Sequence, residues 1–179
     1  IVESIQRENK KIYQEGSNDP DKFGMGTTVV VAALLDDQIL VAHVGDSRGY
    51  IIRDQNIKQL TSDHSLVNEL VKTGEITSDM AENHPRKNVL LRSVGVPGEV
   101  EVDVSTAPIK GEDFILLCSD GLSNMLSAQE MKRIILQEKP LAEKVADLIN
   151  GANEAGGRDN ITALLMDLSE TGKEDDIIL

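Results

Sequence analysis

The sequence has one cysteine, no tryptophan, few other aromatic residues and no long hydrophobic run. Its single cysteine, Cys118, allows no internal disulfide, which favours a reducing cytoplasm. Because Cys118 ends the apolar run 114–117, we expect it to be a buried, inert thiol. The longest apolar run is Val29–Leu35, far short of the about 20 residues that cross a bilayer, and no basic-then-apolar secretory signal is present. We therefore expect no membrane segment.

Basic residues are also scarce, with 18 Lys and Arg against 31 Asp and Glu, for a net charge of −13. No basic stripe with interleaved aromatic residues is present, so nucleic acid is excluded as an expected partner. Hydrophobic residues make up 40% of the 179 residues, and 14 Gly and 5 Pro are too few for a collagen-like or low-complexity chain. The composition predicts one globular domain with its own core.

The first half of the chain combines helical and strand patterns. One-sided apolar spacing predicts a helix over 1–15, ending at Gly16. β-Branched runs separated by polar turns then predict an antiparallel meander. Its strands are expected at 27–35, 39–44, 49–53 and 57–60. A small helical insert follows over 65–83, with Gly74 ending its first helix and Thr77 capping the second.

The second half continues with strands and then two helices. Strands are expected at 89–94, 100–107, 113–118 and 161–168. Ser127 and Glu130 form an S-x-x-E capping box, which predicts a helix from there to about residue 138. A second helix is expected over 141–155. The segregated order of strands and helices favours an α+β fold over alternating βαβ units.

Four aspartates follow strand-like runs and lie beside small or turn-forming residues. They are Asp46, Asp63, Asp120 and Asp159. Carboxylates that converge at one edge of a sheet repel one another unless a cation neutralises them, and oxygen donors suit Mg²⁺, Mn²⁺ or Ca²⁺. The alternative for each aspartate alone is an Asx-turn that shapes the backbone. Only the joint pattern indicates a metal cluster.

Other catalytic templates are missing from the sequence. It has no G-x-S-x-G nucleophile elbow, no G-x-x-x-x-G-K-[ST] phosphate loop and no H-E-x-x-H metal motif. His43, His64 and His84 show no close metal-ligand spacing. His43 is expected to be a core or sheet residue. His64, beside Asp63, either orients a group at the site or makes a hydrogen bond at a helix start.

Five short motifs, taken together and in order from Gly24 to Leu168, resemble those of the metal-dependent type 2C (PPM) serine/threonine protein phosphatases. They are Gly24-Met25-Gly26-Thr27-Thr28, Val44-Gly45-Asp46-Ser47-Arg48, Thr61-Ser62-Asp63-His64-Ser65, Cys118-Ser119-Asp120-Gly121-Leu122 and Gly157-Arg158-Asp159-Asn160-Ile161-Thr162. The resemblance implies a four-layer αββα sandwich of two antiparallel sheets flanked by helices. It also implies a hydrolase of bacterial signalling, in which a metal-activated water attacks phosphoserine or phosphothreonine.

The resemblance further implies roles for individual residues. Asp120 and Asp159 would bind one of two core Mn²⁺ or Mg²⁺ ions, and Asp46 with Asp120 would hold a third ion. Asn160 would orient Asp159. Gly121, Asp63 and His64 are expected to lie behind the metal ligands or adjacent to the site. Beyond the metal ligands, no catalytic residue is expected in the sequence as printed.

The resemblance also sets expectations for the extent of the chain. The segment 65–88, with His84-Pro85 near its end, is similar to the mobile flap of bacterial members. The family's upstream Arg-x-x-Asn-x-Asp and Asp-Gly-Met-Gly-Gly-His motifs are not in the sequence, which begins with Ile1. We therefore expect an N-terminally truncated single phosphatase domain over 1–169, followed by an acidic, disordered tail over 170–179.

The expected protein is a cytoplasmic monomer that acts on phosphoprotein substrates and is paired with a cognate serine/threonine kinase. We expect the full protein to be active and the chain as printed to have an impaired metal centre, since the aspartate that bridges both core ions in the family belongs to the upstream motifs; whether the chain as printed is active is left open. A second hypothesis is a non-catalytic phosphoprotein-binding or regulatory module with an incomplete metal centre. A third is a simple acidic cation-binding domain.

Overall fold

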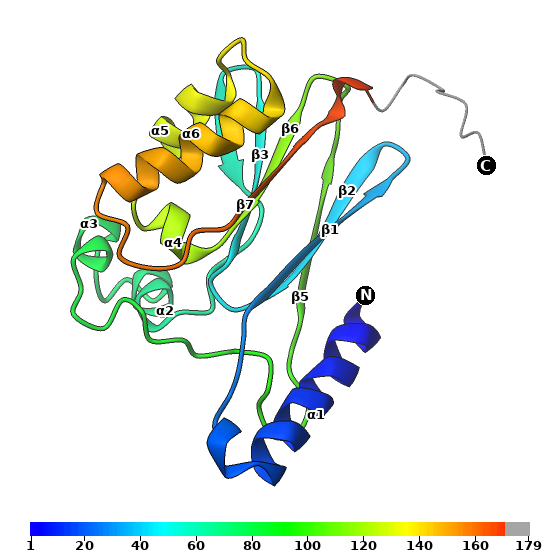
Figure 1. The fold of residues 1–179 in the computed structure, drawn as a ribbon, viewed down its shortest axis with the longest axis vertical. Coiled ribbons are helices and arrows are strands. Elements are labelled where there is room, and N and C mark those ends of the chain that lie inside the picture. Colours follow the sequence, from blue (N-terminus) through cyan, green and yellow to red (C-terminus); the bar gives the residue numbers. More distant parts are fainter. Residues whose placement is uncertain (171–179) are drawn as a thin grey trace. The chain divides into compact units, whose positions relative to one another are not determined.

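The computed structural model describes residues 1–170 (Figure 1), so nearly all of the acidic tail expected at 170–179 lies outside the described residues. Contacts divide the chain into two compact units. The first contains residues 1–31, 41–47 and 61–105, and the second contains residues 32–40, 48–60 and those from 106 onward. None of the described helices is long and apolar enough to cross a membrane.

The fold contains two antiparallel β-sheets together with helices, as expected for the predicted class. One sheet has three strands in the order β1-β2-β5, which are β1 (Val29–Leu35), β2 (Gln38–Val44) and β5 (Asp103–Pro108). The other has four strands in the order β4-β3-β6-β7, which are β4 (Asn56–Gln59), β3 (Arg48–Arg53), β6 (Phe114–Cys118) and β7 (Ala163–Asp167). The prediction of one continuous meander was wrong, because β2 and β3 enter different sheets. The chain changes sheet at Gly45–Ser47.

In the second unit, helices cover an apolar core on the four-stranded sheet. Tyr50 is paired with Leu116, which in turn is paired with Leu165. Helices α4 (Asp120–Ser123), α5 (Ala128–Ile135) and α6 (Leu141–Glu154) complete this unit, and η2 (Leu168–Glu170) follows β7. Leu122, Ile135 and Leu148 supply fully buried side chains to the same cluster. Cys118 is buried there and forms no disulfide among the described residues, which confirms its predicted burial.

The predicted capping box begins α5, although that helix ends earlier than expected. The Ser127 hydroxyl accepts a hydrogen bond from the Glu130 backbone N–H, and the Glu130 carboxylate accepts one from the Ser127 backbone N–H. These reciprocal bonds satisfy donors that a helix start leaves unpaired. Helix α5 ends at Ile135 rather than near residue 138.

In the first unit, α1 (Val2–Asn18) is anchored by a buried polar residue. It continues past Gly16 and is followed by η1 (Pro20–Lys22). The Asn9 amide donates to the carbonyls of Val96 and Gly98, and its oxygen accepts from the N–H groups of Gly95 and Val96. A fully buried amide is tolerated here because all its hydrogen-bonding groups are paired. Asn9 thereby fixes the loop 95–98.

The helical insert forms as predicted, but the strand expected at 89–94 does not. Helices α2 (Leu66–Lys72) and α3 (Ser78–Glu82) begin at Ser65 and Thr77, whose hydroxyls accept backbone N–H groups. Residues 89–94 make only two isolated bridges, between Ser65 and Leu90 and between Thr27 and Val94. Their β-branched character was misleading, because the segment contacts two different partners and cannot form a continuous ladder with either.

Candidate metal centre and its supporting network

Asp120 lies where β6 ends and α4 begins, and hydrogen bonds connect this turn to the segment before β7. The Ser119 backbone N–H donates to the Thr162 carbonyl at 3.1 Å. The Ser119 hydroxyl donates to the Asn160 carbonyl at 3.1 Å and accepts from the Thr162 N–H at 3.0 Å. The two loops that carry Asp120 and Asp159 are therefore held side by side.

Gly121 allows these loops to approach closely. A β-carbon at this position would overlap the carbonyl group of Asn160. Any side chain would push the 159–160 backbone away from Asp120. Gly121 is thus required by the close approach of the backbone.

The carboxylates of Asp120 and Asp159 influence each other electrostatically. Burial and then the charge of Asp159 raise the pKa of Asp120, although the Gly121 N–H and Arg48 oppose the shift. The Asn124 amide donates to Asp120 Oδ2 at 3.2 Å, whereas the Asn160 N–H donates to Asp159 Oδ1 at 2.7 Å. Asn160 contacts Asp159 through its backbone. The ionised form of a half-buried acid beside a second acid is strongly stabilised by an added cation.

Asp46 lies in the other contact unit, on the loop after β2. Gly45, which precedes it, has a φ of +109°, and a β-carbon there would overlap the side chain of Thr28. The hydroxyls of Thr28 and Ser47 lie 2.8 Å apart and are hydrogen-bonded. The half-buried Asp46 is therefore presented by a loop with a fixed backbone.

Asp63 and His64 lie at the start of the insert and have different surroundings. The Asp63 carbonyl accepts a hydrogen bond from the Asn68 amide, which joins it to the first turn of α2. His64 is 7% exposed, and its Nδ1 accepts the Gly45 N–H at 3.1 Å. The structure therefore brings His64 against the loop that carries Asp46.

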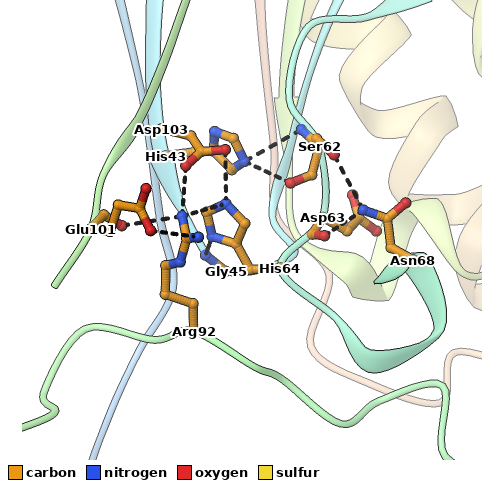
Figure 2. A network of polar contacts seen from close by, with 9 residues as sticks. All are labelled: His43, Gly45, Ser62, Asp63, His64, Asn68, Arg92, Glu101 and Asp103. Atoms are coloured by element: carbon orange, nitrogen blue, oxygen red, sulfur yellow. Dashed lines mark hydrogen bonds and ion pairs between the residues drawn. The ribbon is translucent and has the colours of Figure 1, made fainter. Parts of the chain in front are cut away.

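His64 belongs to a polar network that sequence reasoning missed (Figure 2). Its Nε2 lies 3.2 Å from Asp103 Oδ2, and Asp103 Oδ1 accepts from Arg92 Nη1 at 2.6 Å. Its ring stacks on His43 with centroids 4.6 Å apart. Burial lowers the pKa of His64 despite the opposing hydrogen bond to Asp103. The adjacent pair Asp63-His64 was the only local signal, since Arg92 and Asp103 are distant in sequence.

The donor chemistry of the Asp120–Asp159 pair fits a hard divalent cation. Both residues offer carboxylate oxygens, the donor type that Mg²⁺ and Mn²⁺ favour. The raised pKa of Asp120 reflects burial and a neighbouring negative charge, which are the two effects that a bound cation would offset. The residues present therefore fit the ions that the sequence resemblance implies.

The family model and the relatives of known name agree on one family. The Protein phosphatase 2C family model matches residues 1–70. Serine/threonine phosphatase stp of Listeria monocytogenes serotype 4b is 48% identical over 176 residues, covering 97% of this chain and 70% of the relative.

Two solved structures extend the comparison. The S. agalactiae serine/threonine phosphatase has a TM-score of 0.87 and 47% identity, covering 92% of this chain and 68% of that one. The catalytic domain of the phosphatase PstP, in complex with 2 manganese ions, has a TM-score of 0.79 and 33% identity. The match covers 89% of this chain and 66% of that one. These similarities, which extend over almost the whole sequence, show that the chain belongs to the protein phosphatase 2C family.

Proposed function

We propose that this protein is a metal-dependent serine/threonine protein phosphatase that hydrolyses phosphoserine and phosphothreonine in protein substrates. Its membership of the protein phosphatase 2C family supports the reaction class. The single structural observation that carries the proposal is the Asp120–Asp159 pair, which two tied loops hold close enough for one charge to raise the pKa of the other carboxyl. A pair of acids in this state is suited to cation binding.

We assign Asp120 and Asp159 as ligands of one Mn²⁺ or Mg²⁺ ion and Asp46 as a further cation ligand. When bound, such ions supply Lewis acidity toward the phosphate and an activated water as the nucleophile. The protein's own contribution is to fix the carboxylates. Gly121 permits the close approach of the loops, and the Asn160 N–H holds one oxygen of Asp159.

The proposal includes the wider organisation of the protein. We propose a single phosphatase domain over 1–169, with 65–88 as a flap beside the active site. The thiol of Cys118, which is buried and forms no disulfide among the described residues, is compatible with a reducing cytoplasm. The proposed substrates are phosphoproteins of a cognate serine/threonine kinase, and the proposed state is a monomer.

The test is the release of inorganic phosphate from a phosphothreonine peptide by the 179-residue protein, in Mn²⁺ and again with a chelator. We expect release in Mn²⁺ that stops when the ion is removed. Asp120→Ala and Asp159→Ala should abolish it. Asp37→Ala is the matched control, because Asp37 is exposed in a turn and its described contact uses only the backbone carbonyl.

Two results would contradict the proposal. Phosphate release that persists in chelator would remove the metal from the mechanism. Binding of the phosphopeptide without release in Mn²⁺ would instead favour the second hypothesis, a non-catalytic phosphoprotein-binding module. Equal losses in the Asp37 and Asp120 variants would show that the assay reports folding rather than the site.

A further inference from the structure

Two hydrogen bonds, one to the imidazole and one between backbones, connect His64 to the loop that carries Asp46. The Gly45 N–H donates to His64 Nδ1 at 3.1 Å, and the His64 backbone N–H donates to the Gly45 carbonyl at 2.9 Å. Figure 2 shows the imidazole facing Gly45 within the network. The imidazole therefore holds the Val44–Gly45 peptide, and because Gly45 directly precedes Asp46, a change in the backbone angles of Gly45 would turn the Asp46 side chain as well.

The other side of the imidazole is held by charged residues. Since Nδ1 accepts the Gly45 N–H, the ring proton of neutral His64 lies on Nε2, which donates to Asp103 Oδ2 at 3.2 Å. Arg92 pairs with Asp103 through Nη1 at 2.6 Å and with Glu101 through Nη2 at 3.0 Å. Arg92 Nη1 also lies 3.1 Å from Nε2, but a guanidinium cannot accept a proton, so Asp103 is the group that favours the Nε2–H tautomer, and Arg92 holds Asp103 in place.

A metal ion is a competing explanation for this cluster, because one ligand atom from each of His43, His64 and Asp103 lies within 4.8 Å of the others. The two rings, however, are stacked with an interplanar angle of 19°. An imidazole nitrogen binds a metal in its own ring plane, and two nearly parallel planes do not converge on one ion. The cation Arg92 already occupies the Asp103 carboxylate. The geometry favours a hydrogen-bonded network.

We propose that His64 is a positioning residue: held by Asp103 and Arg92, it fixes the Gly45 peptide and thereby the direction of the Asp46 carboxylate for cation binding. This inference rests on the proposed function, in which Asp46 is a cation ligand. His64 itself touches neither the substrate nor the ion. Its effect passes through one backbone N–H.

Two substitutions at His64 separate the bond to Gly45 from the bond to Asp103. In His64→Asn, the amide oxygen takes the place of Nδ1 and can still accept the Gly45 N–H. In His64→Gln, the amide nitrogen takes the place of Nε2 and can still donate to Asp103, while Gly45 loses its acceptor. Both variants remove the ring stacked on His43, so each controls for the loss of aromatic packing in the other.

The measurements are Mn²⁺ titration calorimetry on the full chain and exchange of the Gly45 amide hydrogen by NMR in the metal-free protein. We expect His64→Gln to weaken Mn²⁺ binding about tenfold and to accelerate Gly45 exchange, because support beyond the ligands tunes metal affinity. His64→Asn should stay within about threefold of the wild type in both. Melting temperatures of the two variants should agree.

A double-mutant comparison tests whether the effect passes through Asp46. In an Asp46→Asn background, His64→Gln should cause no further loss of Mn²⁺ affinity, since interacting residues are not additive. An equal loss in both backgrounds would overturn the proposal. So would wild-type affinity in His64→Gln, or an equal loss in the Asn and Gln variants.

The same titration distinguishes failure of the inference from failure of the proposed function. A wild-type protein that binds no Mn²⁺ would overturn the metal-dependent function and, with it, this role of His64. A wild-type protein that binds Mn²⁺, with variants that bind equally well, would overturn only the positioning role.

Discussion

The two polar clusters of this protein differ in how their carboxylates are neutralised. At Asp103, burial alone would raise the carboxyl pKa, but hydrogen bonds from His64 and Arg92 outweigh it and lower the pKa. At Asp120, burial also raises the pKa, and the neighbouring Asp159 raises it further. The same residue type is therefore charge-compensated by the fold in one place and strained electrostatically in the other.

This difference indicates which cluster has a structural role and which one is suited to bind an ion. A carboxylate that is already paired with a cationic side chain is stabilised little by a metal ion, whereas two adjoining carboxylates are stabilised strongly by one. The Asp103 carboxylate is already paired with His64 and Arg92, and we infer a structural role for this cluster. The Asp120–Asp159 pair is the cluster whose electrostatics favour an added ion.

The largest expected effect comes from removing Asp120. Asp120→Ala should lower Mn²⁺-dependent phosphate release about 10³-fold, or roughly 4 kcal/mol of transition-state stabilisation, because a carboxylate that binds the ion is lost. The measurement is kcat/KM on a phosphothreonine peptide at saturating Mn²⁺. An unchanged kcat/KM would show that Asp120 is not part of the metal centre.

Mn²⁺ itself should distinguish the two clusters through stability. A ligand that binds only the folded state at 100 times its Kd adds about 2.7 kcal/mol to the free energy of unfolding. We expect denaturant melts of the wild type to shift by this order in Mn²⁺ and those of Asp120→Ala to shift much less. An equal shift in both proteins would place the ion elsewhere.

Removing Arg92, the cation of the Asp103 cluster, should have a smaller effect. We expect this effect on the stability of the fold. Arg92→Ala leaves Asp103 and His64 without their charged partner, and because Asp103 is 41% exposed we expect a loss of only about 1 kcal/mol. Denaturant unfolding without metal measures it. Arg86→Ala, at an exposed position of the insert, is the control and should change stability by less than about 0.5 kcal/mol.

The smallest expected effect is on the pH dependence of stability. It should have opposite signs at a carboxyl whose pKa is lowered, Asp113, and at one whose pKa is raised, Asp120. Asp113 is fully buried; burial raises its pKa, but hydrogen bonds from Arg53 and the Lys110 N–H lower it overall. A lowered folded pKa gives stability that is present above the ordinary aspartate pKa of about 3.9 and is lost as the pH falls below it. Asp113→Asn should therefore weaken the acid dependence of unfolding.

Asp120 should show the reverse in metal-free protein. Its raised folded pKa gives stability that is present at acid pH and lost as the pH rises from about 3.9 through the folded pKa. Compared with the wild type, Asp120→Ala should become relatively more stable over this rise. Chemical unfolding at a series of pH values measures both variants, and the same slope in both would remove the electrostatic distinction between the compensated carboxyl of Asp113 and the carboxyl of Asp120.

Elements with local signals could be predicted from the amino-acid sequence. The caps at Thr77 and at Ser127 with Glu130, and the apolar runs of β3 and β6, depend on neighbours within a few residues. The assignment of Asp46, Asp120 and Asp159 as ligands came from a resemblance and stays a prediction. What the structure adds is the proximity of Asp120 to Asp159.

Contacts between distant segments could not be predicted in this way and became visible in the folded chain. Residues 89–94 have strand-like composition, but two separate partners prevent a ladder. Asp103 and Arg92 reach His64 from positions far along the chain, so no local pattern could indicate the network. Sequence periodicity reports which side of an element is apolar, whereas the pairing of buried polar groups depends on which elements meet, and that is fixed by packing of the whole chain.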